Sequence, residues 1–320
     1  MTVGIRHVAC YLPPGELRSA DLAKRMGFKP GFLEDKVGVD VRHIAAADES
    51  TSDMAVRAFE NLVKRVPNED FGDVGLVLLC TQNPDYKIPH TAGIIQHRSG
   101  LPKSALSFDI SLACSGYVTT IVTAKALMAE LGVRKALVFT ADPYSKIIDP
   151  DDRTTIALFG DAASVSVLEE GAPLRICKSC FGNDSSKAAA LIIPGSGTAK
   201  TTAGHEHLHL DGRAIYELLK TEAPANIRAC AALNGLTLAE VDLYLFHQAS
   251  AWLLKTLRED LDLPPEKVPV NIRNVGNTVS SSIPLLLEPI LYGDKPLPPT
   301  VMMAGFGGGL AWGSVLLRCG

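Results

Sequence analysis

Several features are absent from this 320-residue chain, and each absence excludes a class of protein. Lys and Arg number 31 against 35 Asp and Glu, so the net charge of −4 leaves no basic surplus for nucleic-acid phosphates. No apolar run approaches the roughly 18 residues of a membrane span. The opening residues, MTVGI, lack the basic-then-apolar pattern of a secretory signal. We therefore expect a cytoplasmic protein that binds neither nucleic acid nor membrane.

Cysteine is also scarce, with seven residues at irregular spacing. An odd number without an export signal favours reduced thiols over a disulfide framework. Two groups are similar to metal ligands: the CxxC of Cys177 and Cys180, and the alternating His205, His207 and His209. Neither group has the residues that complete a zinc site, so we predict no metal.

Apolar patterns typical of strands alternate with patterns typical of helices. The runs at 74–80 (VGLVLLC) and 135–140 (KALVFT) are short and continuously apolar, as buried strands are. Each follows a segment whose apolar residues recur at helical spacing, 56–66 and 118–128. This alternation predicts an α/β fold with a layered, largely parallel sheet.

Two pairs of segments resemble one another across the chain. Residues 73–80 are similar to 240–247, and residues 157–161 are similar to 304–308. Any two buried strands look alike, so these pairs are compatible with chance as well as with an ancient duplication. A duplication would divide the chain into an N-terminal half, 1–170, and a C-terminal half, 171–320.

Cys114 is the most informative position for chemistry. A strand-like run ends at the small residues Ala113, Cys114, Ser115 and Gly116, and an amphipathic helical pattern begins just after them. A thiol in such a turn faces backbone N–H groups and the positive end of the helix dipole, which lower its pKa. Local context alone leaves two alternatives open, a nucleophile and a buried structural cysteine.

Two later residues and a run of glycines could act together with a thiol nucleophile. His247 ends the second of the similar strand segments, where ligands bind in open α/β sheets, and Asn277 lies in a turn-like VGNT. The glycines 307–309 allow backbone amides to face a ligand. A hydrogen-bonded core His, a plain turn Asn and a tight β-turn are the structural alternatives. A papain-like protease is excluded, because Leu112 and Ala113 precede the cysteine and no aromatic residue follows it.

Taken together, these motifs resemble the 3-oxoacyl-acyl-carrier-protein synthase III family of the thiolase-like superfamily. The resemblance implies a thiolase-like fold with duplicated βαβαβαββ halves in a layered α-β-α-β-α arrangement, usually as a homodimer. It extends nearly end to end and includes residues 10–13 (CYLP), 41–45 (VRHIA), 83–85 (NPD), 149–155 (DPDDRTT), 159–161 (FGD), 247–249 (HQA), 276–278 (GNT) and 305–314 (GFGGGLAWGS).

The resemblance also implies a mechanism without a resident cofactor, in which acyl-CoA is a substrate. The Cys114 thiolate takes an acyl group from a thioester, typically an acyl-CoA, and a malonyl thioester then binds. His247 and Asn277 donate hydrogen bonds to the thioester carbonyl, which stabilise the enolate formed as CO₂ leaves. The N–H groups of Cys114 and Gly308 form the oxyanion hole. Donors placed where charge develops stabilise the transition state most.

The residues expected to contact coenzyme A depart from the family pattern. Phe32 and Lys36 occupy positions where the family has Trp and Arg, Arg153 matches a second nucleotide-contacting Arg, and Ser250 replaces an Asn. Lys keeps the charge of Arg but not its planar fork. Ile88 lies where the family has a residue that gates the acyl tunnel, often donated across the dimer.

The surface expected to dock acyl carrier protein has lost basic residues. Its matching positions are Glu217, Trp252, Glu259 and Asp260, with Lys255 and Arg258 nearby. Because carrier proteins are acidic, these changes weaken steering of a carrier. An extender on coenzyme A or on a specialised carrier therefore stays open. So do two alternatives to condensation, a non-decarboxylating acyltransferase to a small O- or N-acceptor and a non-catalytic partner of an active homologue.

Overall fold

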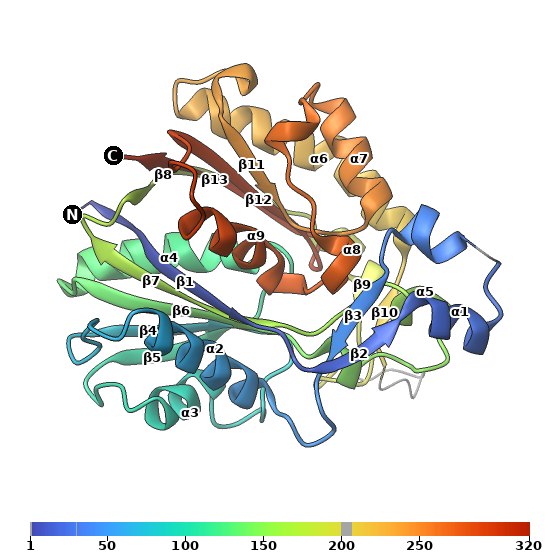
Figure 1. Cartoon of the computed structure of the whole chain (residues 1–320), viewed down its shortest axis with the longest axis horizontal. Coiled ribbons are helices and arrows are strands. Elements are labelled where there is room, and N and C mark those ends of the chain that lie inside the picture. Colours follow the sequence, from blue (N-terminus) through green and yellow to red (C-terminus); the bar gives the residue numbers. More distant parts are fainter. Residues whose placement is uncertain (1, 30, 200–206) are drawn as a thin grey trace.

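The computed structural model describes residues 2–29, 31–199 and 207–320. Its main strands form one nine-stranded mixed sheet in the order β11-β12-β13-β8-β1-β7-β6-β4-β5 (Figure 1). These strands are β1 Val3–Tyr11, β4 Leu76–Cys80, β5 Leu106–Ile110, β6 Lys135–Ala141, β7 Ala163–Glu170, β8 Leu174–Asn183, β11 Leu243–Phe246, β12 Thr300–Gly307 and β13 Ala311–Cys319. Two small ribbons pair β2 Gly15–Arg18 with β3 Val41–Ile44, and β9 Leu191–Ile192 with β10 His209–Leu210.

The helices connect and cover these strands. The longest, α6, spans Gly212–Leu233 and carries Pro224 within it. The other α-helices are α1 Ser19–Met26, α2 Thr51–Arg65, α3 Thr91–Arg98, α4 Gly116–Leu131, α5 Arg153–Ile156, α7 Ala251–Asp260, α8 Ile272–Val275 and α9 Ser282–Leu291, and the short helices are η1 Leu33–Val37, η2 Tyr144–Lys146, η3 Ser185–Ala190, η4 Leu238–Glu240, η5 Pro265–Lys267 and η6 Val279–Ser281.

The same strand arrangement occurs in both halves of the chain. In the first half, β1 pairs antiparallel with β7, β7 antiparallel with β6, and β6 parallel with β4. In the second half, β8, β13, β12 and β11 follow in the same order with the same relative directions. Of the segments that are similar in sequence, 73–80 and 240–247 contain the equivalent strands β4 and β11, whereas 157–161 is a connection before β7 and 304–308 lies mostly within β12. The division at residue 170 stays a prediction.

Five layers of structure result from this arrangement (Figure 1). Helices α4 and α9 lie between the two halves of the sheet, because α4 packs on β4, β6, β12 and β13, and α9 packs on β1 and β11. Helices α2 and α3 cover the outer face of the first half, whereas α6 covers the second and carries α7 on it. The layered α-β-α-β-α fold is confirmed. The expectation of a largely parallel sheet is wrong, because five of the eight strand pairings in the large sheet are antiparallel.

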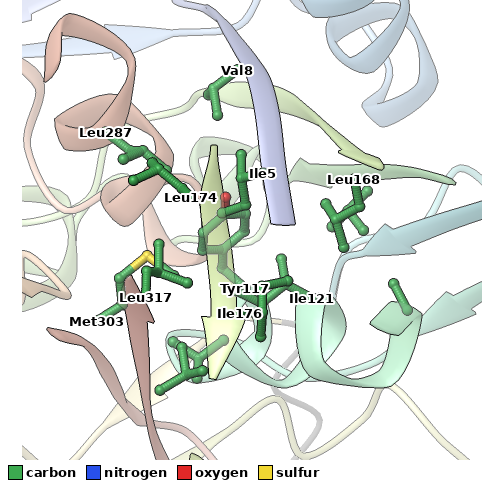
Figure 2. Close-up of a cluster of buried hydrophobic side chains, with 14 of the residues drawn as sticks. Ile5, Val8, Tyr117, Ile121, Leu168, Leu174, Ile176, Leu287, Met303 and Leu317 are labelled. Carbon is green, nitrogen blue, oxygen red and sulfur yellow. The ribbon is translucent and has the colours of Figure 1, made fainter. Parts of the chain in front are cut away.

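The central core lies around α4 and α9, where side chains from both halves interlock. Figure 2 shows Ile5 and Tyr117 in the middle of this cluster, with Leu168 on one side and Leu317, Met303 and Leu287 of α9 on the other. All of these side chains are buried, and burying one such side chain contributes about 1.5–3 kcal/mol. Because α4 is enclosed between two sheet halves, most of its faces are apolar, and its start at Gly116 is held firmly beside Cys114.

Local predictions from the sequence agree with the elements observed. The strands expected at 74–80 and 135–140 are β4 and β6, and the helices expected at 56–66 and 118–128 lie within α2 and α4. Helix α2 begins at a capping box in which Ser50 and Asp53 bond each other's backbone N–H. Of the alternating histidines, His205 lies outside the described residues. In the ranges that the structure covers, no helix has the length and apolar character to cross a membrane.

Candidate active site

Cys114 lies in the turn between β5 and α4, two residues before the helix begins. Its side chain is 6% exposed, so the sulfur is nearly enclosed. Gly307, at the end of β12, packs directly against it, since a Cβ at Gly307 would lie 2.8 Å from the Cys114 sulfur. Only a residue without a side chain allows the second half of the chain to approach the sulfur this closely.

Two backbone N–H groups face the Cys114 sulfur, those of Cys114 and Gly308. This is the pair predicted for the oxyanion hole. The expected fall in the pKa of the thiol is wrong, however. Burial, followed by the negative charge of Asp142, raises the pKa of the Cys114 thiol, and the two N–H groups offset this only in part. In the free enzyme the sulfur therefore carries its proton at neutral pH.

Asp142 is a buried carboxylate near this sulfur that the sequence analysis missed. It lies just after β6 and accepts hydrogen bonds from the Gln82 N–H at 2.9 Å, the Thr81 hydroxyl at 3.3 Å and the Ser280 hydroxyl. Burial raises the pKa of Asp142 to about 7, and those hydrogen bonds act in the opposite direction. An acidic residue at the carboxyl end of a buried strand was the available signal.

His247 directly follows β11 and is held there by its backbone, since its N–H donates to the Ala304 carbonyl of β12 at 2.9 Å. The side chain is 1% exposed, and burial lowers its pKa to about 3, so the imidazole is neutral at physiological pH. The Nδ1 atom lies 2.8 Å from the Ser282 hydroxyl, and the ring packs edge-on against Phe306. Both contacts restrict the orientation of the ring.

Asn277 follows α8, and backbone hydrogen bonds join it to the first half of the chain. Its N–H donates to the Leu158 carbonyl at 2.9 Å, and its carbonyl accepts from Gly160 at 3.0 Å. The Val279 N–H donates to Oδ1 of the side chain at 3.0 Å, which leaves the NH₂ group as a donor. The chain reaches this position through Gly276, whose φ of 72° favours glycine.

The three residues predicted to be catalytic line one small pocket. Cys114, His247 and Asn277 surround a volume of about 120 Å³ at the carboxyl ends of the parallel strands β11 and β12. The remaining walls are mostly apolar. They come from β9, β10, α6, α7 and β12, from the connection after α5 and from that between β11 and α7: Leu158, Leu191, Leu210, Gly212, Ile215, Ala249, Ser250, Leu253, Phe306 and Gly307.

Phe28, which the sequence analysis missed, lies between two of the residues predicted to bind coenzyme A. The rings of Phe28 and Phe32 stack at 5.6 Å, and the Arg153 guanidinium lies 4.3 Å from the centre of the Phe28 ring. Phe32, Lys36 and Arg153 are all exposed. Aromatic and cationic groups are therefore together on the surface, where an adenine base could stack.

Ser250 and Ile88 lie in different places. Ser250 lines the pocket and also caps α7, because its hydroxyl accepts a hydrogen bond from the Leu253 N–H at 3.2 Å. Ile88 is 87% exposed and does not line the pocket of its own chain. Within one subunit, the structure therefore does not bring Ile88 to the site.

Fold and pocket together define a thiolase-like protein with a cysteine at the centre of its pocket. Models of the 3-oxoacyl-[acyl-carrier-protein] synthase III family match residues 108–185, and models of its C-terminal region match residues 231–319. The chain is 31% identical to a β-ketoacyl-[acyl-carrier-protein] synthase III of Neisseria meningitidis, over 96% of each chain.

Solved structures of 3-oxoacyl-[acyl-carrier-protein] synthase III proteins superpose closely on this chain. One of a β-ketoacyl-[acyl-carrier-protein] synthase III from Thermus thermophilus has a TM-score of 0.91 at 30% identity, covering 99% of each chain. A second, of the 3-oxoacyl-(acyl-carrier-protein) synthase III from Pseudomonas aeruginosa, has a TM-score of 0.89 at 31% identity, covering 100% of this chain and 98% of the other. The chain belongs to the 3-oxoacyl-[acyl-carrier-protein] synthase III family.

Proposed function

We propose that this enzyme condenses an acyl-CoA primer with a malonyl thioester, releasing CO₂ and forming a 3-oxoacyl thioester. The observation that carries the proposal is the convergence of Cys114, His247 and Asn277 on one pocket. The family to which the chain belongs supports the same reaction, and so does its similarity to a β-ketoacyl-[acyl-carrier-protein] synthase III.

The first half-reaction acylates Cys114. The sulfur attacks the thioester carbonyl of acyl-CoA, and the N–H groups of Cys114 and Gly308 stabilise the oxyanion that forms. The C–S bond to coenzyme A then breaks, and the acyl group remains on Cys114. Apolar walls around the sulfur suit an acyl chain and exclude water that would hydrolyse the new thioester.

The second half-reaction uses the two polar side chains of the C-terminal half. As the malonyl group loses CO₂, negative charge develops on the thioester oxygen, where the Asn277 NH₂ and the His247 ring donate hydrogen bonds. The enolate carbon attacks the acyl carbonyl, and the sulfur of Cys114 leaves. The exposed stack of Phe32, Phe28 and Arg153, with Lys36 nearby, would hold the nucleotide end of coenzyme A.

Incubation with a panel of acyl-CoAs, followed by intact mass measurement, tests this function. We expect one acyl adduct per chain with at least one donor, and CO₂ release when malonyl-CoA or a malonyl carrier protein is added. Absence of an adduct with every donor would favour a non-catalytic partner. An adduct that passes to an alcohol or amine without CO₂ release would favour the non-decarboxylating acyltransferase.

The surface around α7 supports an extender that is not carried by a strongly acidic protein. Glu217 lies 3.3 Å from the Lys187 ammonium and 3.5 Å from the Arg213 guanidinium, so it pairs with both cations and cancels one of their two charges. Glu259 does the same for Lys255 and Arg258. Trp252 is 49% exposed and packs against Tyr216 at 5.0 Å. Coenzyme A or a specialised carrier suits this surface better than an acidic carrier does.

Reversing charge on this surface should improve the use of an acidic carrier. The double variant Glu217→Lys/Glu259→Lys is expected to raise kcat/KM for malonyl carrier protein by about tenfold at low salt, because it frees cations that steer an anionic partner. Steady-state rates at increasing salt measure the effect. Glu60→Lys/Glu130→Lys, on α2 and α4, makes the same change in net charge and should have little effect. Equal gains in both variants would contradict the proposed docking surface.

A homodimer is the assembly that the surface supports. Strand β5 is at one edge of the large sheet, and Leu106 on it is exposed. Tyr86 and Ile88 form a further exposed apolar group in the loop that precedes α3. A second copy that covered this edge would bury these side chains and would allow Ile88 to reach the partner's acyl pocket. The halves 1–170 and 171–320 are proposed as the duplicated units within each subunit.

A further inference from the structure

The Ser282 hydroxyl connects the ring of His247 to the backbone carbonyl of Val279 by hydrogen bonds. It begins α9 and is 1% exposed, as buried as the imidazole that it contacts. Its hydroxyl lies 2.8 Å from Nδ1 of His247 and donates to the Val279 carbonyl at 2.6 Å. Three groups therefore form one hydrogen-bond chain: the Val279 carbonyl, the Ser282 hydroxyl and the His247 imidazole.

Val279, whose carbonyl ends this hydrogen-bond chain, has an uncommon backbone conformation. Val279 has a φ of 51°, which β-branched residues rarely adopt. Its N–H is already used by Oδ1 of Asn277, and the residue is buried. The Val279 peptide groups therefore have little freedom, and the acceptor offered to Ser282 is fixed in position.

The single hydrogen of the Ser282 hydroxyl decides which ring nitrogen of His247 is protonated. A serine hydroxyl has one hydrogen, and here the hydrogen points to the Val279 carbonyl. The hydroxyl can then only accept from His247, so Nδ1 must carry the proton. The neutral ring then has its lone pair at Nε2. The ring also hydrogen-bonds the Val279 backbone, which opposes the fall in its pKa, so the carbonyl acts on the imidazole directly as well as through Ser282.

We infer that Ser282 is a positioning residue which, anchored by the Val279 carbonyl, keeps His247 in the tautomer that is protonated at Nδ1 and bare at Nε2. The chemical use of this tautomer rests on the proposed function. A bare Nε2 is a proton acceptor, and Cys114 lines the same pocket with a thiol that keeps its proton. Ser282 therefore sets His247 up as the base that receives the thiol proton.

The proton balance of the reaction agrees with this assignment. The thiol proton moves to Nε2 as the Cys114 sulfur attacks acyl-CoA, and Nε2 passes it to the coenzyme A sulfur as that sulfur leaves, so the buried ring is neutral again. When the malonyl carboxylate binds, its negative charge favours uptake of a solvent proton at Nε2, and this N–H donates to the enolate as CO₂ leaves. After condensation, the sulfur departs as a thiolate and recovers its proton from Nε2. One solvent proton is consumed in each cycle, and one CO₂ and one coenzyme A are released.

Nitrogen-15 NMR of the histidine-labelled enzyme, without substrate, tests the tautomer directly, because protonated and bare ring nitrogens have different shifts. Comparison with His247→Ala assigns the His247 signals. We expect wild type to show Nδ1 protonated and Nε2 bare, and Ser282→Ala to show a mixture of the two tautomers. Acylation of Cys114, followed by mass, should slow by up to about 10²-fold in Ser282→Ala with little change in the KM for acyl-CoA.

Ser281→Ala is the matched control. Ser281 is equally buried, but its hydroxyl contacts Thr140 at 2.7 Å and the Ala162 carbonyl rather than His247. This variant should keep the wild-type tautomer and rate. A proton on Nε2 in wild type would overturn the inference, and so would unchanged shifts and acylation in Ser282→Ala. Failure of wild type to take any acyl group would count against the proposed function instead, and the NMR comparison would still decide the tautomer.

Discussion

Cys114→Ala is expected to take up no acyl group from any acyl-CoA and to lose condensation by at least about 10⁴-fold, as removal of a covalent nucleophile typically does. The fold should remain, because the change removes one atom from a small buried space. Intact mass after incubation with acyl-CoA measures the adduct, and release of labelled CO₂ measures the complete reaction.

The matched control for this variant is a neighbouring thiol. Cys80 is fully buried, its Sγ lies 2.8 Å from the Leu112 carbonyl, and it does not line the pocket. Cys80→Ala should therefore be acylated like wild type. An adduct that persists in Cys114→Ala, or one that disappears in Cys80→Ala, would show that the acyl group is carried by another residue.

Asn277→Ala is expected to separate the two half-reactions. Loss of one donor to a developing oxyanion typically lowers a rate by about 10²–10³-fold, so decarboxylation of the malonyl thioester should fall by that factor. Acylation of Cys114 should fall much less than decarboxylation, because the oxyanion of that step faces the N–H groups of Cys114 and Gly308 and Asn277 acts on it only through the Val279 N–H that its Oδ1 accepts. Single-turnover measurement of adduct formation and of CO₂ release provides both rates.

Asn274→Ala, in the helix that precedes Asn277, provides the control. Asn274 lies on α8, is exposed and does not line the pocket. Both half-reactions should be unaffected in this variant. A loss of acylation in Asn277→Ala as large as its loss of decarboxylation would contradict the role assigned to the carboxamide and would indicate a structural one.

Much of the fold was predictable because its signals are local. The apolar runs of β4 and β6 and the helical spacing within α2 and α4 follow from residues that are neighbours in sequence. The similar segments around 73–80 and 240–247 occupy equivalent strands in the two halves. The residues of the pocket could be named only together, by resemblance to a family, since Cys114 or His247 alone also fits a structural role.

The parts that could not be predicted depend on groups brought together from distant positions. Phe28 contacts Arg153, which is far along the chain, and neither position alone predicts a stacked pair. The pKa of Cys114 was expected to fall because the helix terminus is visible in the sequence. Burial and Asp142 are not visible there, and they raise it. A pKa depends on the dielectric and charges within a few ångströms, whatever their sequence separation.

The sequence by itself determined the α/β alternation, the positions of Cys114, His247 and Asn277, and the acidic residues that replace expected cations around α7. These are properties of residue type and of short-range spacing. The tertiary structure alone decided the chemical state of the site. It placed Asp142 near the sulfur and Ser282 against the imidazole, because protonation states and tautomers depend on which hydrogen-bond partners the folded chain supplies.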